Sequence, residues 1–301
     1  MSALKAELVL DVRNETGESP VWSAREQALY WVDIPASCVQ RWSARDGTIA
    51  GWKTPEAISC LAPTRTLNRW IAGAESGVAM LHLEPGVPLQ CDIRVPANHA
   101  MEHMRFNDGK CDRQGRFLAG TMVWDGRPGA GSSVGALYQV GRDSKQRSLL
   151  QGFKKPNGLA FSPDGKTMYL SDSHPAERMV WAFDYDVQTG TPVNRRPFLE
   201  MGRFAGRPDG AAVDTDGCYW ICGTDAGLVH RYTPLGQLDY SVSVPVAKPS
   251  MCAFGGTDMR TLYITSMQGG ATSDPDNQDG GVFAIHLANA QGLHEPEFVE
   301  A

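Results

Sequence analysis

Six polar residues recur at one position of a repeated phrase, and together they could hold a hard divalent cation. In its clearest form the phrase has a carboxamide or carboxylate residue, then glycine, then apolar residues, as after Pro156-Asn157-Gly158 and Pro208-Asp209-Gly210. Carboxylate, carboxamide and hydroxyl oxygens are the donors that such cations prefer. One residue comes from each copy of the phrase: Glu18, Ser59, Asn107, Asn157, Asp209 and Ser250.

The elements that must position these residues are six copies of one unit, spaced roughly 40 to 50 residues apart. Each copy opens with the polar phrase and an apolar strand and turns at Pro, Asp or Gly, as hairpins require. An aromatic-rich second strand and a third strand with small residues at its front follow. The second strands match in length and in the placement of bulky residues, at 28–33, 69–74, 116–121, 167–172, 218–223 and 261–266.

This period is that of four-stranded propeller blades and predicts an all-β fold, a six-bladed β-propeller that spans residues 1–301 as a single domain. The fourth strand of each copy has a weaker strand pattern, as expected at the outer edge of a blade. No segment combines the 3.6-residue period of a helix with capping signals, so no helix is predicted. The sixth copy is too short to supply a fourth strand. We therefore expect Glu7 to Val12 to form it and to close the ring.

A propeller brings the openings of its innermost strands to one mouth of the central channel. The six polar residues would then form a ring of oxygen atoms, whereas a purely structural channel is more simply filled by small apolar side chains. For Ser59 and Ser250 we expect only channel-filling hydroxyls. The four large residues Trp31, Trp70, Trp181 and Trp220 are expected to pack within the blades.

Several phrases, in order along essentially the whole chain, are those of a known family. They are G-E-S-P-V-W at Gly17, R-F-N-D-G-K at Arg105, G-T-M at Gly120, P-N-G-L-A-F-S-P-D-G at Pro156, F-D-Y-D at Phe183, P-D-G at Pro208 and C-A-F-G-G at Cys252. Together they resemble the SMP-30/gluconolactonase/regucalcin family. The resemblance implies a six-bladed propeller that hydrolyses an aldono- or aldarolactone with one divalent cation, which could be calcium, zinc, manganese, magnesium or iron.

Carried over residue by residue, the resemblance implies three metal ligands, Glu18, Asn157 and Asp209, with Asn107 close to the metal. Asp209 would also be the catalytic general base. The chemistry suits this set, because a lactone is an ester that needs a polarised carbonyl and a base for the attacking water.

The same resemblance places Arg105, Asn107 and Asp108 against the substrate. Asp125 stands where animal members carry a glutamate, so it belongs to the substrate rim. Which sugar lactone is taken stays open, since only rim loops would distinguish one from another. These loops are Val123 to Ser133 and Thr272 to Gly280.

Two other functions stay open at this stage. One is a non-catalytic propeller, either a calcium-binding regulatory protein or a protein-binding platform, since fold alone does not decide function. The other is a metal-dependent esterase or phosphotriesterase, because the same cation would polarise a phosphoryl oxygen. A platform has no need for Glu18, Asn157 and Asp209 at one repeat position, which favours the lactonase.

The charge composition indicates which classes of binding partner fit this chain. With 28 basic and 34 acidic residues, a formal charge of -6 and no basic run, the chain does not fit nucleic acid or an anionic membrane. A small neutral or locally handled substrate fits better, and the resemblance implies that this substrate is a sugar lactone. No oligomeric state is predicted. Residues 1–12 lack a signal-peptide pattern, so we expect a cytoplasmic protein. The seven scattered cysteines are expected to be reduced.

Three motifs resemble other sites and are set aside. His99 to His103 matches a zinc-binding pattern that requires a helix, and Pro96 with strand patterns on either side leaves no room for one. Gly131 to Gly135 matches a nucleophile elbow but is followed by a strand in place of a helix. Asp274 to Gly281 resembles a calcium loop whose acids are out of register, and we expect a solvated loop there.

Overall fold

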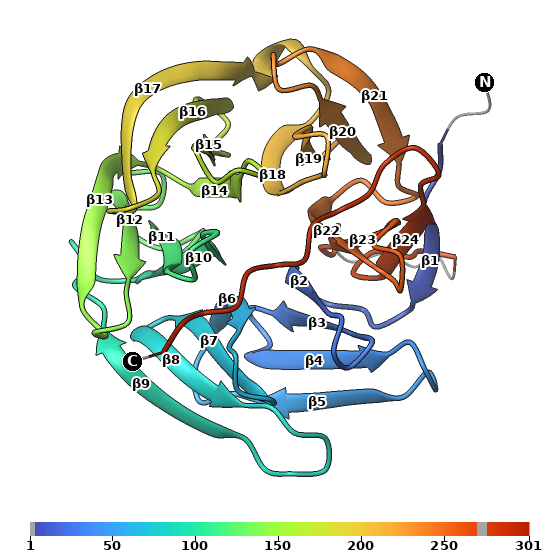
Figure 1. Cartoon of the computed structure of the whole chain (residues 1–301), viewed down its shortest axis with the longest axis horizontal. Coiled ribbons are helices and arrows are strands. Elements are labelled where there is room, and N and C mark those ends of the chain that lie inside the picture. The colour runs from blue at the N-terminus through green and yellow to red at the C-terminus, as the bar shows by residue number, and fades with distance from the viewer. Residues whose placement is uncertain (1–3, 270–275, 301) are drawn as a thin grey trace.

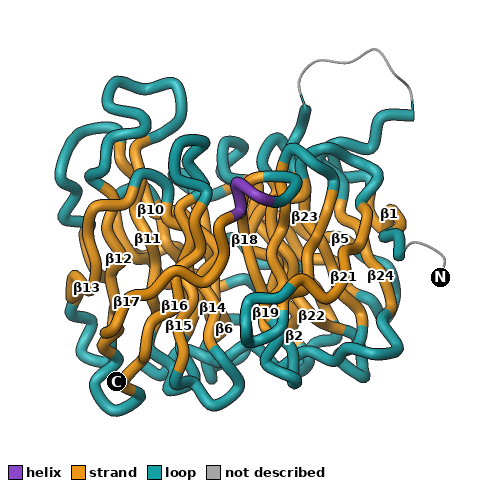
Figure 2. Tube along the Cα trace, turned by 90° about the horizontal axis from the view of Figure 1, so that it is seen from above, coloured by secondary structure: helices purple, strands orange, loops and turns teal. Residues whose placement is uncertain are grey.

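Six four-stranded antiparallel sheets form a ring in the computed structural model, which describes residues 4–269 and 276–300 (Figure 1). The predicted six-bladed β-propeller is therefore confirmed. The only helix among the described residues is the short 3-10 helix η1 (Met201–Arg203). Seen from the side, the strands run through the thickness of the ring and loops gather at its two faces (Figure 2).

Each blade contributes its first strand to the inside of the ring, where the first strands of successive blades contact one another. Blades one to three consist of β2 (Gly17–Ser23), β3 (Ala28–Asp33), β4 (Cys38–Ser43), β5 (Ile49–Lys53); β6 (Ile58–Pro63), β7 (Arg69–Ala74), β8 (Gly77–His82), β9 (Gln90–Pro96); and β10 (Met104–Cys111), β11 (Phe117–Val123), β12 (Gly135–Val140), β13 (Gln146–Phe153). Blades four and five consist of β14 (Pro156–Phe161), β15 (Thr167–Asp172), β16 (Met179–Asp186), β17 (Thr191–Glu200); and β18 (Arg207–Val213), β19 (Tyr219–Thr224), β20 (Leu228–Tyr232), β21 (Leu238–Ser243). Blade six consists of β22 (Pro249–Gly255), β23 (Thr261–Ser266), β24 (Val282–His286) and the N-terminal strand β1 (Glu7–Leu10).

The ring closes as the sequence predicts. Strand β1 pairs antiparallel with β24, so the chain's first strand is the outer edge of its last blade. Leu10 and Ala6 are buried there, and their apolar contacts add to the hydrogen bonds of the ladder. Closure of this kind protects the edge of β24, which would otherwise present unpaired backbone groups.

A register irregularity interrupts the pairing of every first strand with the second strand of its blade, at the repeated polar position. A bulge takes residues out of the ladder and increases the local twist, which turns the side chains at that point. The sequence repeat is thus a repeat of six bulges. They fall between Glu18 and Val21, Ile58 and Cys60, Phe106 and Gly109, Asn157 and Ala160, Pro208 and Ala211, and Pro249 and Cys252.

Gly158 shows why glycine follows the polar residue. Its φ of 59° lies in the left-handed region, which side chains disfavour. A Cβ built there would lie 2.6 Å from the Tyr219 hydroxyl oxygen, and that hydroxyl donates a 2.7 Å hydrogen bond to the Gly158 carbonyl. The bulge therefore packs directly against the next blade.

Aromatic side chains fill the spaces within and between blades. Trp31, Trp70 and Trp220 are almost completely buried, and Trp181 packs against Phe153 of the preceding blade at 5.8 Å between ring centroids. The expected packing role of the four tryptophans is confirmed. The seven cysteines are all free thiols.

The C-terminal segment, residues 291–300, crosses the axis of the ring (red in Figure 1). It bridges hairpin turns of three blades, since Gly292 pairs with Asp214, Phe298 with Thr64, and the Val299 amide donates to the Gly115 carbonyl. These turns follow the ends of the first strands. The segment therefore covers the end of the channel opposite to the polar openings of those strands.

Candidate functional site

A cavity of about 420 Å³ opens where the first strands begin. Its lining includes all three predicted metal ligands and three of the four predicted substrate residues. The fold thus brings together Glu18, Asn157, Asp209, Arg105, Asn107 and Asp125, which come from blades one, three, four and five.

Asn157 and Asp209 are buried at the base of this cavity and are joined by a hydrogen bond of 2.5 Å from Asn157 Nδ2 to Asp209 Oδ1. Asn157 Nδ2 also donates to Ser173 Oγ at 3.3 Å, so the amide orientation leaves its Oδ1 for another partner. No other hydrogen bond to the Asp209 carboxylate occurs within residues 4–269 and 276–300. Glu18 accepts only the 3.3 Å bond from the Ser19 amide in the same part of the chain.

The electrostatics of the two carboxylates disfavour their charged forms. Burial raises the pKa of Asp209 to about 7, with repulsion from Asp108 adding to this and Arg207, Lys155 and the Asn157 hydrogen bond opposing it. Burial and repulsion by Asp209 and Asp108 raise the pKa of Glu18 well above its ordinary value. Two neighbouring carboxylates with raised pKa values, beside a carboxamide oxygen, form a donor set that suits a hard divalent cation.

These donors fit a hard divalent cation by their chemistry. Within the described ranges, no group of three or more His, Cys, Asp and Glu side chains is placed to hold a metal ion. The predicted ligand set has two such residues and an asparagine. All three line the same cavity, where Asn157 and Asp209 are buried and Glu18 is half-buried.

Arg105 is held rigidly on the wall of the cavity. Its Nη1 donates to Asn107 Oδ1 and to the Phe106 carbonyl, both at 2.7 Å, and its guanidinium lies 4.5 Å from the centre of the Trp124 ring. Asn107 Nδ2 in turn donates to the Pro156 carbonyl at 3.0 Å. The oxygen of Asn107 is therefore taken by Arg105, and Asn107 acts on the site by orienting that guanidinium.

The structure does not bring Asp108 to the surface of the cavity. Its Oδ2 accepts a 2.7 Å hydrogen bond from the Leu159 amide and its Oδ1 is buried without a hydrogen-bond partner. Asp108 fixes β14 of the next blade, and its charge reaches the site only through its effect on Glu18 and Asp209. Asp125, by contrast, lies on the exposed rim, where both of its oxygens accept from Lys155 Nζ at 2.8 Å.

Three cations of the lining were missed by the sequence reasoning, namely Lys155, Arg207 and Lys248. A signal for them exists, because each stands two residues before the polar residue of its blade, as Arg105 does. Residues two apart on a strand share a face. The spacing therefore identifies four cations at one mouth, in blades three to six.

The motifs that were set aside carry no site. Residues 97–103 contain no helix, and His99 Nε2 lies 2.7 Å from the Glu75 carbonyl oxygen. Gly131 to Gly135 forms a turn that leads into strand β12, as expected. The loop 272–280 and the calcium-like stretch 274–281 lie partly outside the described residues.

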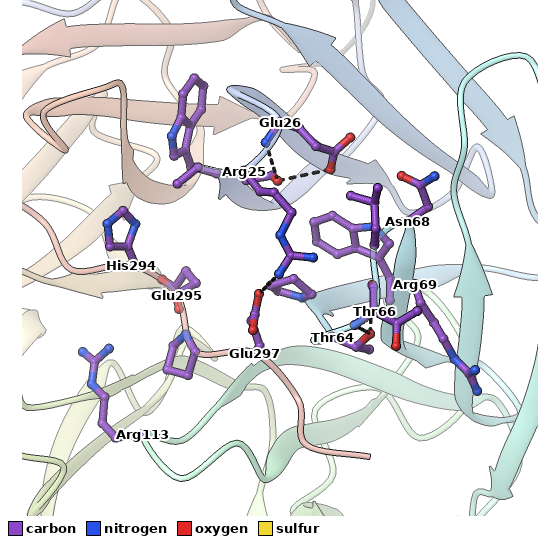
Figure 3. Close-up of a pocket in the computed structure, with 17 residues that line it drawn as sticks. Arg25, Glu26, Thr64, Thr66, Asn68, Arg69, Arg113, His294, Glu295 and Glu297 are labelled. Atoms are coloured by element: carbon purple, nitrogen blue, oxygen red, sulfur yellow. Dashed lines mark hydrogen bonds and ion pairs between the residues drawn. The ribbon is translucent and has the colours of Figure 1, made fainter. Parts of the chain in front are cut away.

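A second and larger cavity, of about 520 Å³, lies at the opposite end, between the turns of blades one and two and the C-terminal segment (Figure 3). None of the six repeated polar residues lines it. The arginine side chains of this cavity already have partners within the protein. Arg25 pairs with Glu297 at 2.7 Å and Arg69 pairs with Glu300 at 3.0 Å. Arg113 donates hydrogen bonds to backbone carbonyls of β14 and the following turn. This cavity is larger but contains none of the repeated oxygen donors.

Comparison with known proteins agrees with this architecture. Residues 16–268 match the family described as the SMP-30/Gluconolactonase/LRE-like region. The chain belongs to this family.

Particular relatives are similar over nearly the full length. A 6-deoxy-6-sulfogluconolactonase of Pseudomonas putida is 39% identical over 286 residues, which is 94% of each chain. A regucalcin of Danio rerio is 36% identical over 267 residues, 88% of each chain. Among solved structures, a luciferin-regenerating enzyme superposes with a TM-score of 0.89 at 25% identity, covering 98% of this chain and 99% of that one.

No helix in the described part of the chain is long and apolar enough to cross a membrane.

Proposed function

We propose that this protein hydrolyses a sugar lactone to the open-chain sugar acid in the 420 Å³ cavity. The observation that carries the proposal is the convergence of Glu18, Asn157 and Asp209 with the oriented Arg105 in that one cavity. The names of the relatives support the same class, since one is a lactonase of a substituted gluconolactone. The reaction makes the protein a carboxylic ester hydrolase.

Glu18, Asn157 and Asp209 would hold one divalent cation, which when bound polarises an ester carbonyl and acidifies water. Asp209 is placed to do a second task. One of its oxygens accepts from Asn157, and the other has no hydrogen bond within the described residues. We assign Asp209 as the general base that takes a proton from the attacking water.

The remaining steps follow from the ester chemistry and the side chains at hand. As the new C–O bond forms, the carbonyl oxygen gains negative charge. When the tetrahedral intermediate collapses, the ring C–O bond breaks and the proton held by Asp209 passes to the leaving ring oxygen, which becomes a hydroxyl of the open-chain sugar acid. Arg105, oriented by Asn107 and stacked on Trp124, would bind sugar hydroxyls or the developing oxyanion. Asp125 on the rim would contact the outer hydroxyls of the substrate.

The test is a pH-indicator assay of purified protein against a panel of aldonolactones, before and after chelation and with single metals added back. Acid release that disappears with chelator and returns with a divalent cation is the expected result. Binding of calcium without hydrolysis of any lactone would instead identify a non-catalytic propeller, the function that the regucalcin relatives leave open. Hydrolysis confined to aryl or phosphate esters would identify an esterase.

A further inference from the structure

Four cations surround the cavity mouth of a protein whose overall formal charge is -6. Arg105, Lys155, Arg207 and Lys248 all line the same 420 Å³ cavity and come from four consecutive blades. This concentration of positive charge is local, because the chain as a whole has more acidic than basic residues.

Two of these cations are neutralised by rim carboxylates. Lys155 pairs with Asp125 at 2.8 Å, and Arg207 Nε pairs with Asp225 at 2.5 Å. Their positive charge is therefore largely matched inside the protein.

The other two have no acidic partner within ion-pair distance among the described residues. Arg105 bonds only to the Phe106 carbonyl and the Asn107 carboxamide. Lys248, half-buried directly before β22, forms neither a hydrogen bond nor an ion pair through its side chain within residues 4–269 and 276–300. Asp225 is within electrostatic reach of Lys248, but its carboxylate is bonded to Arg207.

The acids around the mouth, in the part of the chain that the structure describes, leave Lys248 without a partner. The cavity lining holds four acids, Glu15, Glu18, Asp125 and Asp209, beside the four basic residues. Glu18 and Asp209 are assigned to the cation under the proposed function, whereas Asp125 and Asp225 pair with Lys155 and Arg207. The half-buried ammonium group of Lys248 is therefore available to an anionic ligand.

We propose that the substrate is a lactone carrying an anionic group on its exocyclic carbon, and that Lys248 binds this group. The inference rests on the proposed lactonase function and narrows its substrate class. Blades three and six face each other across the ring axis, so Arg105 and Lys248 lie on opposite sides of the mouth (Figure 1). A lactone centred over Glu18, Asn157 and Asp209 then presents one end to Arg105 and its charged end to Lys248.

A carboxylate, a phosphate and a sulfonate share the chemistry that Lys248 recognises. The experiment therefore compares glucono-1,5-lactone with lactones of the same ring that carry each of these groups at the terminal carbon. The wild-type protein is expected to show a higher kcat/KM for at least one charged lactone than for the neutral one. This advantage should shrink as salt rises, because salt screens the attraction of an exposed mouth for an anion.

The variant Lys248→Met should lower the ratio of kcat/KM for the charged lactone to kcat/KM for the neutral lactone by about tenfold. This is the change expected from the loss of one charge-assisted hydrogen bond. Lys248→Glu should lower it further. The matched control is Lys166→Met, which removes an exposed lysine in the turn after β14, at the opposite end of the first strand, and should keep the ratio. Equal urea midpoints for the variants and wild type show that folding is intact.

Equal kcat/KM for neutral and charged lactones in the wild type, without salt dependence, overturns this inference and leaves the lactonase function standing. An unchanged ratio in both Lys248 variants overturns the assignment to Lys248. Failure of every lactone to react overturns the proposed function and this inference with it. The salt dependence is measured on the wild type, so the test does not depend on the folding of any variant.

Discussion

Replacing Asp209 by asparagine should make the metal-free protein more stable. The structure buries Asp209 next to Glu18, and the raised pKa of both carboxylates shows that their charged forms are disfavoured in the fold. Asparagine removes one of these charges and has nearly the same shape. Its Oδ1 still accepts the hydrogen bond from Asn157 Nδ2 that Asp209 receives at 2.5 Å.

The magnitude follows from the pKa of Asp209, which rises from 3.8 to about 7. Each pKa unit corresponds to about 1.4 kcal/mol, so the ionised carboxylate costs the fold on the order of 4 kcal/mol above pH 7. The folded state binds this proton more tightly than the unfolded state does. The free energy of unfolding of the metal-free wild type should therefore fall as pH rises from about 4 to about 7, and level off above it.

The assay is urea unfolding of wild type and Asp209→Asn in the presence of a chelator, at pH 8 and pH 5. We expect the variant to gain up to about 4 kcal/mol at pH 8 and about 1 to 2 kcal/mol at pH 5, where Asp209 is already mostly protonated in the fold. The matched control is Asp225→Asn. Hydrogen bonding to Arg207 lowers the pKa of this half-exposed rim carboxylate, so the change should cost up to about 1 kcal/mol.

Addition of a divalent cation should stabilise the wild type more than the Asp209 variant, because only the folded wild type offers two carboxylates to it. A variant that is less stable than wild type at pH 8 in chelator would refute the reasoning. So would a gain of the same size at both pH values, since that would arise from packing and not from ionisation.

Three further predictions address the site and the ring. In a metal titration of lactone hydrolysis, Glu18→Gln should recover much of its rate at high metal, whereas Asp209→Asn should stay about 10² to 10⁴ slower than wild type because it lacks the base. Near wild-type turnover by Asp209→Asn would mean that another residue is the base. Arg105→Ala should raise KM or lower kcat about tenfold or more. Its metal content, measured by mass spectrometry, should stay the same, and a metal-free variant would show that Arg105 has a structural role. Deletion of residues 1–12 should lower the free energy of unfolding by several kcal/mol while unfolding stays cooperative, because β1 and its ladder on β24 are lost. An unchanged melting curve would mean that the ring does not need this strand.

Much of the fold could be predicted because propeller blades repeat in sequence. The period, the strand pattern and the short sixth copy led to six blades closed by the N-terminal strand, and the structure confirms both. The repeated polar position is visible for the same reason, so the sequence alone groups Glu18, Asn157 and Asp209. The cations Lys155, Arg207 and Lys248 stand at an equally regular spacing and were overlooked, since total charge was considered and its local pattern was not.

Other features had no signal of this kind. Asp108 follows Asn107 directly, yet the bulge in β10 sends its carboxylate to the Leu159 amide and away from the cavity surface. The C-terminal segment has no strand pattern. Its place is decided by contacts with turns of three different blades, for which a linear pattern offers no guide.

The amino-acid sequence by itself determined the number of blades, the polar residue that opens each one, and the identity of the oxygen donors. These are local properties, since alternation along a strand and the chemistry of a turn depend on neighbours in the chain. Tertiary structure decided which of the polar groups share a cavity, how deeply they are buried, and which charges are left unmatched. Burial and pairing depend on residues from other blades, and so the raised pKa of Asp209 and the unpaired Lys248 exist only once the ring has closed.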